Sequence, residues 1–277
     1  MPYANSGSVR LNYETTGEGY PILFIHEFAG DHASCEQQVR YFSRRYTCIT
    51  YNARGYPPSE VPESGDAYSQ QRAVDDAAAV LRHLGVTRAH IVGLSMGGFC
   101  TVHFGMQHAA TSRSLVVAGC GYGSPPHQHA EFSRLSRDNG EKLAKDGMAK
   151  FAPEYSAVPS RLTLKRKNPR GFAEYLKSFS AHSTTGSAMH FRHVQGARPS
   201  LWDFEDKLKR LPMPVLVING DTDESCLETG HWLKRIVPVC GHWVMPWTGH
   251  AMNLEEPEAF NLGVERFLAE VEVKSAA

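Results

Sequence analysis

Short apolar runs recur along the chain and are separated by segments of helical character. Such runs are typical of parallel strands that are buried on both faces of a sheet. The pattern predicts buried strands over residues 21–26, 46–51, 89–92, 114–118, 214–219 and 238–244. Residues 9–15 instead alternate apolar with polar side chains, which indicates an edge strand.

Helical patterns lie between these strands. Val74, Ala77 and Leu81 recur at helical spacing within residues 68–84, and Gly85 is placed to end that helix. Further helices are predicted over residues 96–109 and 256–271. Strands that alternate with helices predict an α/β fold, a doubly wound and mostly parallel sheet.

The alternation stops once, between residues 122 and 211, where polar helical segments and prolines replace the buried strands. Glycine- and proline-rich stretches at residues 121–126 and 211–214 mark the two ends of this segment. We therefore predict an α/β core of residues 1–121 and 212–277, interrupted by a mostly helical cap of residues 122–211.

Composition is typical of an ordinary globular protein and does not favour a nucleic-acid or membrane-surface binder. The 277 residues are 42% hydrophobic and 21% charged, with a formal net charge of zero. We interpret the basic cluster Arg161, Lys165, Arg166, Lys167 and Arg170 as a solvated face. The first residues show no basic and apolar leader pattern, and no apolar run reaches the ~20 residues of a membrane span. We expect a cytoplasmic protein with reduced cysteines, and a homodimer is compatible with the sequence.

The chemistry of the chain is indicated first by Gly93-Leu94-Ser95-Met96-Gly97, which follows an apolar strand and opens a helical segment. This is the context of a nucleophile elbow, a turn so tight that small residues must flank the serine at two positions on either side. The turn presents the serine hydroxyl above the sheet. It also leaves the Met96 N–H at a helix N-terminus, free to face an oxyanion.

A serine nucleophile needs an imidazole base and a carboxylate that orients the base. Two later loops supply these groups in the expected order, Gly220-Asp221-Thr222-Asp223 and Gly249-His250. Asp221 is the alternative acid, and its other role is to hydrogen-bond the turn. His242 is the alternative base, but it lies within a predicted strand rather than beyond it.

These motifs, with His26-Glu27-Phe28, Arg54-Gly55 and Glu255-Glu256-Pro257, make the chain resemble the α/β-hydrolase superfamily over essentially its whole length. The resemblance implies Asp223 as the acid, the Phe28 amide as the second oxyanion donor, and a structural role for Arg54. Glu27 departs from the family, which has glycine there. A carboxylate beside an oxyanion hole opposes the developing charge unless it is turned away or paired. We expect Glu27 to point to solvent, to be paired, or to cap the segment from Ala29 onward, with contact to substrate as the alternative.

The resemblance implies hydrolysis of an ester or lactone through an acyl-enzyme on Ser95, with His250 as base and Asp223 as its partner. The alternatives are cleavage of a carbon–carbon bond in a β-diketone-type or vinylogous substrate, and a non-catalytic receptor on the same fold. Relatives with haloalkane dehalogenase or epoxide hydrolase chemistry carry aspartate where this chain has Ser95. We expect a small-molecule substrate and no nucleic-acid, membrane, cofactor or metal partner. Candidate pocket residues, besides Phe28, are Glu27, Met148, Trp202 and Met252.

Overall fold

An eight-stranded sheet forms the centre of the molecule in the computed structural model, which describes residues 2–276, with side chains to residue 273. The strand order is β1-β2-β4-β3-β5-β6-β7-β8. β1 and β2 are antiparallel to their neighbours, and all other pairs are parallel. The strands are β1 (Tyr3–Ser6), β2 (Val9–Thr16), β3 (Tyr20–Ile25), β4 (Tyr46–Tyr51), β5 (Ala89–Leu94), β6 (Ser112–Ala118), β7 (Val215–Gly220) and β8 (Cys240–Met245).

The predicted fold class is confirmed, and the buried runs all form strands within a few residues of their predicted ends. One prediction is wrong, because residues 9–15 are not the edge. β1 pairs with the outer side of β2 in the register Ala4↔Leu11 and takes the edge position itself. Its sequence Tyr-Ala-Asn-Ser is short, and asparagine is depleted in strands, so the pattern gave no sign of it.

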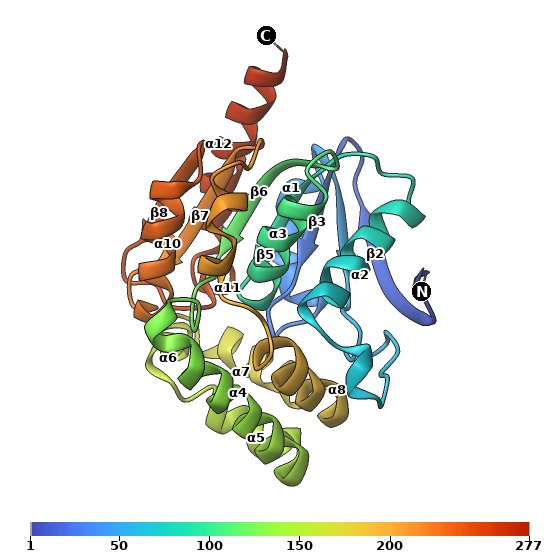
Figure 1. The fold of residues 1–277 in the computed structure, drawn as a ribbon, viewed down its shortest axis with the longest axis vertical. Helices are drawn as coiled ribbons and strands as arrows, with labels where there is room; N and C mark the ends of the chain where they lie inside the picture. The colour runs from blue at the N-terminus through green and yellow to red at the C-terminus, as the bar shows by residue number, and fades with distance from the viewer. Residues whose placement is uncertain (1, 277) are drawn as a thin grey trace.

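Helices cover both faces of the sheet (Figure 1). The helices that accompany the core strands are α1 (Glu36–Phe42), α2 (Gln70–His83), α3 (Met96–Gln107), α10 (Glu224–Ile236), α11 (Met252–Glu255) and α12 (Pro257–Ala276). Alternate residues of β3 enter different hydrophobic cores: Leu23 belongs to the cluster that includes residues of α2, α3 and α10, and Phe24 to the cluster that includes residues of α1 and α12. A strand buried on both faces requires this alternation.

The cap lies between β6 and β7 in sequence and beside the sheet in space (Figure 1). Its described residues form helices and loops only. The helices are α4 (Pro126–Asp146), α5 (Met148–Tyr155), α6 (Pro159–Lys167), α7 (Pro169–Ser180), α8 (Thr184–Met189) and α9 (Glu205–Leu208), with a π-helix at His190–Gln195 and a 3₁₀ turn at Leu201–Phe204.

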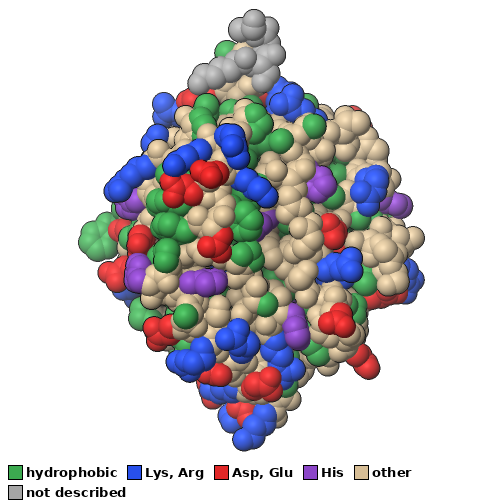
Figure 2. All heavy atoms as spheres, viewed as in Figure 1, with side chains coloured by type: hydrophobic (Ala, Val, Ile, Leu, Met, Phe, Trp, Pro, Cys, Tyr) green, Lys and Arg blue, Asp and Glu red, His purple; other side chains and the backbone are tan. Residues whose placement is uncertain are grey.

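Among the described residues, no helix combines the length and the apolar character that a membrane crossing requires. Acidic and basic side chains are interspersed over the face shown in Figure 2, as the balanced composition suggests. The predicted structural role of Arg54 agrees with its surroundings. The guanidinium is buried and donates to the carboxylate of Asp76 on α2, with Nε to Oδ2 at 2.7 Å.

Candidate active site

Ser95 occupies a strained turn between β5 and α3. Its backbone has φ 51° and ψ −111°, a left-handed conformation that non-glycine residues rarely adopt. A Cβ at Gly93 would collide with the Gly97 carbonyl oxygen, and a Cβ at Gly97 would collide with the Ile25 carbonyl oxygen. The elbow sequence therefore folds this way because only glycine allows strand and helix to approach so closely.

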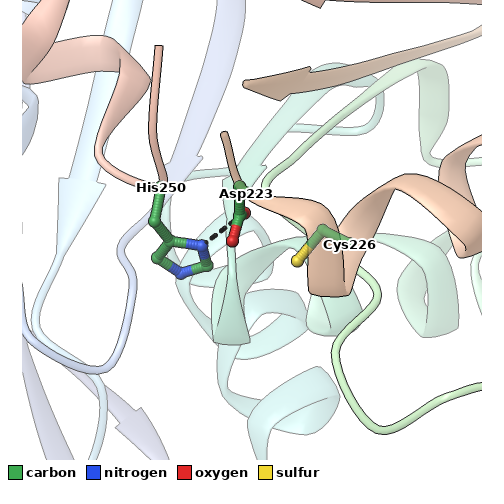
Figure 3. A group of neighbouring side chains, drawn as sticks. All are labelled: Asp223, Cys226 and His250. Carbon is green, nitrogen blue, oxygen red and sulfur yellow. Dashed lines mark hydrogen bonds and ion pairs between the residues drawn. The ribbon is translucent and has the colours of Figure 1, made fainter. Parts of the chain in front are cut away.

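Asp223 and His250 meet at the carboxyl ends of β7 and β8. His250 Nδ1 donates a hydrogen bond to Asp223 Oδ2 at 2.7 Å (Figure 3). Asp221, the alternative acid, instead accepts the backbone N–H groups of Trp247 and Thr248 and so stabilises the turn. His242, the alternative base, lies inside β8 and bonds to Asn219.

The Asp223–His250 pair has the charge properties that a base requires. Burial lowers the pKa of His250, but the charge and hydrogen bond of Asp223 outweigh burial and hold that pKa above its ordinary value. Burial likewise raises the pKa of Asp223, yet the facing imidazole keeps it below its ordinary value overall. Because Nδ1 donates to Asp223, the neutral ring has Nε2 free to accept a proton.

Ser95 and His250 line one cavity, together with Gly119. No hydrogen bond joins the two side chains in this structure, although both are among its described residues. Contacts of this kind are often long in the unliganded state and tighten when substrate binds. His250 Nε2 lies 3.9 Å from Oε2 of Glu27.

The loop after β3 is fixed by three hydrogen bonds, two to its own carbonyl groups and one to the His26 side chain. His26 Nδ1 donates to the Glu27 carbonyl at 2.7 Å, and His26 Nε2 accepts the Ala53 N–H at 3.1 Å. The Tyr56 hydroxyl donates to the Phe28 carbonyl at 2.9 Å. The Phe28 N–H has no acceptor among the described residues, and Met96 is the first residue of α3, where an N–H has no intrahelical acceptor.

Glu27 neither points to solvent nor caps a helix, contrary to two of the three expected arrangements. Asp31 is the N-cap residue of the helical turn that follows it. The Glu27 side chain is buried against the helices of the cap insertion. Arg161 of α6 donates to both of its oxygens, at 2.6 Å to Oε2 and 3.2 Å to Oε1. The third arrangement, a paired carboxylate, is the one observed.

Arg161 also corrects the prediction of a solvated basic face. Only 4% of Arg161 is exposed, whereas Lys165, Arg166, Lys167 and Arg170 are exposed as expected. The reason is a tertiary contact, because Glu27 lies 134 residues away and offers the carboxylate that a buried arginine requires. Burial raises the pKa of Glu27, but the Arg161 charge outweighs it and holds that pKa below its ordinary value, so the pair is ionised.

The cavity above Ser95 has a volume of about 150 Å³ and is walled mainly by the cap. Its aromatic wall consists of Phe99, Tyr122, Phe132, Tyr155 and Phe191, and its polar lining of Ser136, Asn139, Gln195 and Arg198. None of these residues was predicted. Helical cap segments have no motif that distinguishes a lining residue from a packing residue, so the sequence offered no signal.

The predicted pocket residues do not line this cavity. Met148 is buried at the start of cap helix α5, and Met252 is buried in the cluster that contains Phe24 of β3. Trp202 stacks on Trp232, with ring centroids 3.9 Å apart, and so packs the cap against the core. Phe28 does not line the cavity but packs against Phe191, which does, with the two ring centroids 4.1 Å apart.

Cys226 joins Asp223 and His250 in a cluster whose composition could suggest a metal site (Figure 3). Burial raises the pKa of the Cys226 thiol well above its ordinary value, so the thiol remains protonated and donates to the Gly119 carbonyl. The His250 Nδ1 proton lies between imidazole and carboxylate, where a metal ion would have to bind. These residues therefore suit proton transfer better than metal binding.

Comparison with known proteins identifies the family to which this fold belongs. The sequence profile of the alpha/beta hydrolase fold family matches residues 20–257, so the chain belongs to that family. It is 24% identical to 3-oxoadipate enol-lactonase 1 of Acinetobacter baylyi, over 86% of this chain and 85% of that protein. It is 28% identical to 2-hydroxymuconate semialdehyde hydrolase of Pseudomonas putida, over 95% and 92%. A thermophilic esterase from Thermogutta terrifontis superposes with a TM-score of 0.83 at 25% identity, covering 95% of this chain and 94% of the esterase.

Proposed function

We propose that this protein is a serine hydrolase that cleaves a carboxylic ester or lactone through an acyl-enzyme on Ser95. The observation that carries the proposal is the Asp223–His250 hydrogen bond of 2.7 Å, which orients an imidazole that shares a cavity with a serine in an elbow turn. A hydroxyl, an oriented base and two free amides are the parts that acyl transfer requires.

The reaction proceeds in two halves. Ser95 Oγ attacks the carbonyl carbon while His250 Nε2 takes its proton, and the amides of Phe28 and Met96 stabilise the resulting oxyanion. The C–O bond to the leaving alcohol then breaks as His250 returns the proton to it. Water attacks the acyl-enzyme in the same way, releasing the acid and restoring Ser95. A lactone opens by the same steps, and its alcohol remains on the acyl chain.

The Glu27–Arg161 pair removes an obstacle to this mechanism. An unpaired carboxylate beside the Phe28 amide would oppose negative charge on the substrate oxygen. Arg161 compensates that charge through two hydrogen bonds, one to each carboxylate oxygen. Glu27 Oε2 still lies 3.9 Å from His250 Nε2, where it favours the imidazolium that forms during the reaction.

Relatives named as an enol-lactonase and an esterase support the ester or lactone assignment, while the similar semialdehyde hydrolase keeps carbon–carbon bond cleavage as the alternative. A panel of neutral aryl esters, lactones and β-diketones separates the two. We expect turnover of esters or lactones, and we expect Ser95→Ala to lower it by about 10⁴–10⁶-fold.

The Ser95→Ala/His250→Ala double variant is the control for a shared step. It should be no slower than either single variant, because the two residues act as a unit. Ester turnover that survives Ser95→Ala, or cleavage of β-diketones alone, would overturn the proposal.

A further inference from the structure

Arg198 lies in the cavity above Ser95 without a counter-charge. It follows the π-helix of residues His190–Gln195, and only 4% of it is exposed. Its guanidinium packs over two aromatic rings, with Cζ 3.5 Å from the centroid of Phe99 and 4.5 Å from that of Phe132. Phe99 is one helical turn after Ser95, so these rings hold the cation close to the nucleophile.

The polar contacts of Arg198 are few for a buried arginine. Nη2 donates to the Tyr122 carbonyl at 2.7 Å, and no carboxylate among the described residues forms an ion pair with it. Among the residues that the structure describes, no aspartate or glutamate lines the cavity. Burial lowers the pKa of Arg198 to about 10, so the side chain remains a cation at neutral pH. A buried charge without a partner is costly, which indicates that a ligand completes the site.

Gln195 provides a second, independent indication. Its side chain lines the same cavity and is 8% exposed, and its buried amide nitrogen has no hydrogen-bond partner. Buried polar groups in folded proteins are nearly always paired, so an unpaired donor on a residue that lines the cavity suggests an acceptor that binds there. Ser136 and Asn139 add further polar groups to the same lining.

We propose that Arg198 and Gln195 bind a carboxylate of the substrate, so that the enzyme prefers esters or lactones that carry a second, ionised acid group. A carboxylate accepts hydrogen bonds from both donors and neutralises the uncompensated charge of Arg198. The inference rests on the proposed function for its choice of substrate.

The volume of the cavity also limits the size of the substrate group that enters it. A volume of about 150 Å³ admits a group about the size of benzene. Short dicarboxylic monoesters, such as aryl hemisuccinates and hemiglutarates, meet this limit. Esters of a hydroxy acid place the carboxylate on the leaving group instead, and comparing the two series identifies the side of the ester bond that faces Arg198.

The test compares kcat/KM for aryl hemiglutarate with kcat/KM for its neutral methyl ester. The same comparison is made between the ionised ester of the hydroxy acid and its neutral methyl ester. In the wild type, one anionic series should exceed its neutral counterpart by about 10- to 100-fold, the size expected for charge-assisted hydrogen bonds. Arg198→Met should abolish this preference, Arg198→Lys should retain part of it, and Gln195→Leu should reduce it. A cooperative urea unfolding transition reports that each variant is folded.

Arg137→Met is the matched control. Arg137 of α4 is exposed and donates at 2.7 Å to the carbonyl of Gly196, in the loop that carries Arg198. It does not line the cavity. Its removal should leave the preference unchanged. A wild type without preference, or a preference that survives Arg198→Met, would overturn the inference and leave Arg198 as a packing residue.

Binding of glutarate itself separates this inference from the proposed function. Calorimetry on wild type and Ser95→Ala requires no turnover, and glutarate should bind both proteins but not Arg198→Met. Such binding without ester hydrolysis would reject the hydrolase and retain the anion site. Hydrolysis of neutral esters without glutarate binding would reject the anion site and retain the hydrolase.

Discussion

Arg161 and Arg198 are both buried arginines of the cap, yet their surroundings are opposite. Arg161 donates to the Tyr175 hydroxyl and to both oxygens of Glu27. Its bonds to Glu27 join the cap to the loop that carries Phe28. Arg198 donates to one backbone carbonyl and packs against two aromatic rings. Burial lowers the pKa of both, but the charge of Glu27 reverses the effect for Arg161 alone.

The difference separates two tasks that meet above Ser95. A charge that is compensated within the protein can position a loop and a base without attracting ligands. A charge that is left uncompensated in a cavity raises the affinity for an anion at that point. We infer that the Glu27–Arg161 region serves the chemistry of the reaction, and that the Arg198 region selects the substrate.

Breaking the ion pair should produce the larger effect on stability. Arg161→Met strands the Glu27 carboxylate in the interior, and we expect a loss of about 3–5 kcal/mol in the free energy of unfolding. Arg198→Met removes an unpaired cation together with its aromatic contacts, so its loss should stay below about 2 kcal/mol. Urea unfolding at neutral pH measures both values.

The double variant Glu27→Gln/Arg161→Met is the control for this comparison. It removes the stranded carboxylate, so it should be more stable than Arg161→Met alone. Equal losses for the two single arginine variants would show that the ion pair is not what distinguishes the two regions.

The pH dependence of activity sharpens the comparison further. His250 must be neutral to accept the Ser95 proton, so kcat/KM should fall as pH decreases through its pKa, above the ordinary 6.5. Glu27 raises the pKa of His250 and Arg161 lowers it, so Glu27→Gln should move this acid limb to lower pH. Arg198→Met should leave the limb in place. A profile that moves with Arg198→Met and not with Glu27→Gln would reverse the assignment of the two regions.

The smallest effect should be that of Glu27→Gln on substrate charge. Because neither Glu27 nor Arg161 lines the cavity above Ser95, ratios of kcat/KM among matched neutral, anionic and cationic esters should be nearly equal in this variant and the wild type. A selective gain for the anionic ester would show instead that Glu27 faces the substrate.

The sequence predicted those parts of the molecule that local pattern determines. Buried strands need continuous apolar runs, and an elbow turn needs glycine at positions 93 and 97, so the sheet and the place of Ser95 could be predicted. Asp223 and His250 follow strands β7 and β8, whose carboxyl ends converge in any parallel sheet, and the structure brings the two side chains together.

Contacts between core and cap could not be predicted in the same way. Glu27 is buried because α6 brings Arg161 to it from 134 positions away, and no local pattern encodes that distance. The cavity wall depends on how the π-helix turns Phe191 and Gln195 inward, and a π-helix has no clear signature in a single sequence. The predicted pocket residues Met148 and Trp202 had the right chemistry but lie in packing positions.

The central claim is that Ser95 becomes covalently bound to the substrate acyl group. A dialkyl nitrophenyl phosphate tests it directly, because its phosphorus is attacked like the ester carbonyl and the product on serine is stable. Peptide mass spectrometry should find one dialkylphosphoryl group per chain, on Ser95, with release of one equivalent of nitrophenolate and none in Ser95→Ala. An unlabelled wild type, or equal labelling of Ser95→Ala, would contradict the account.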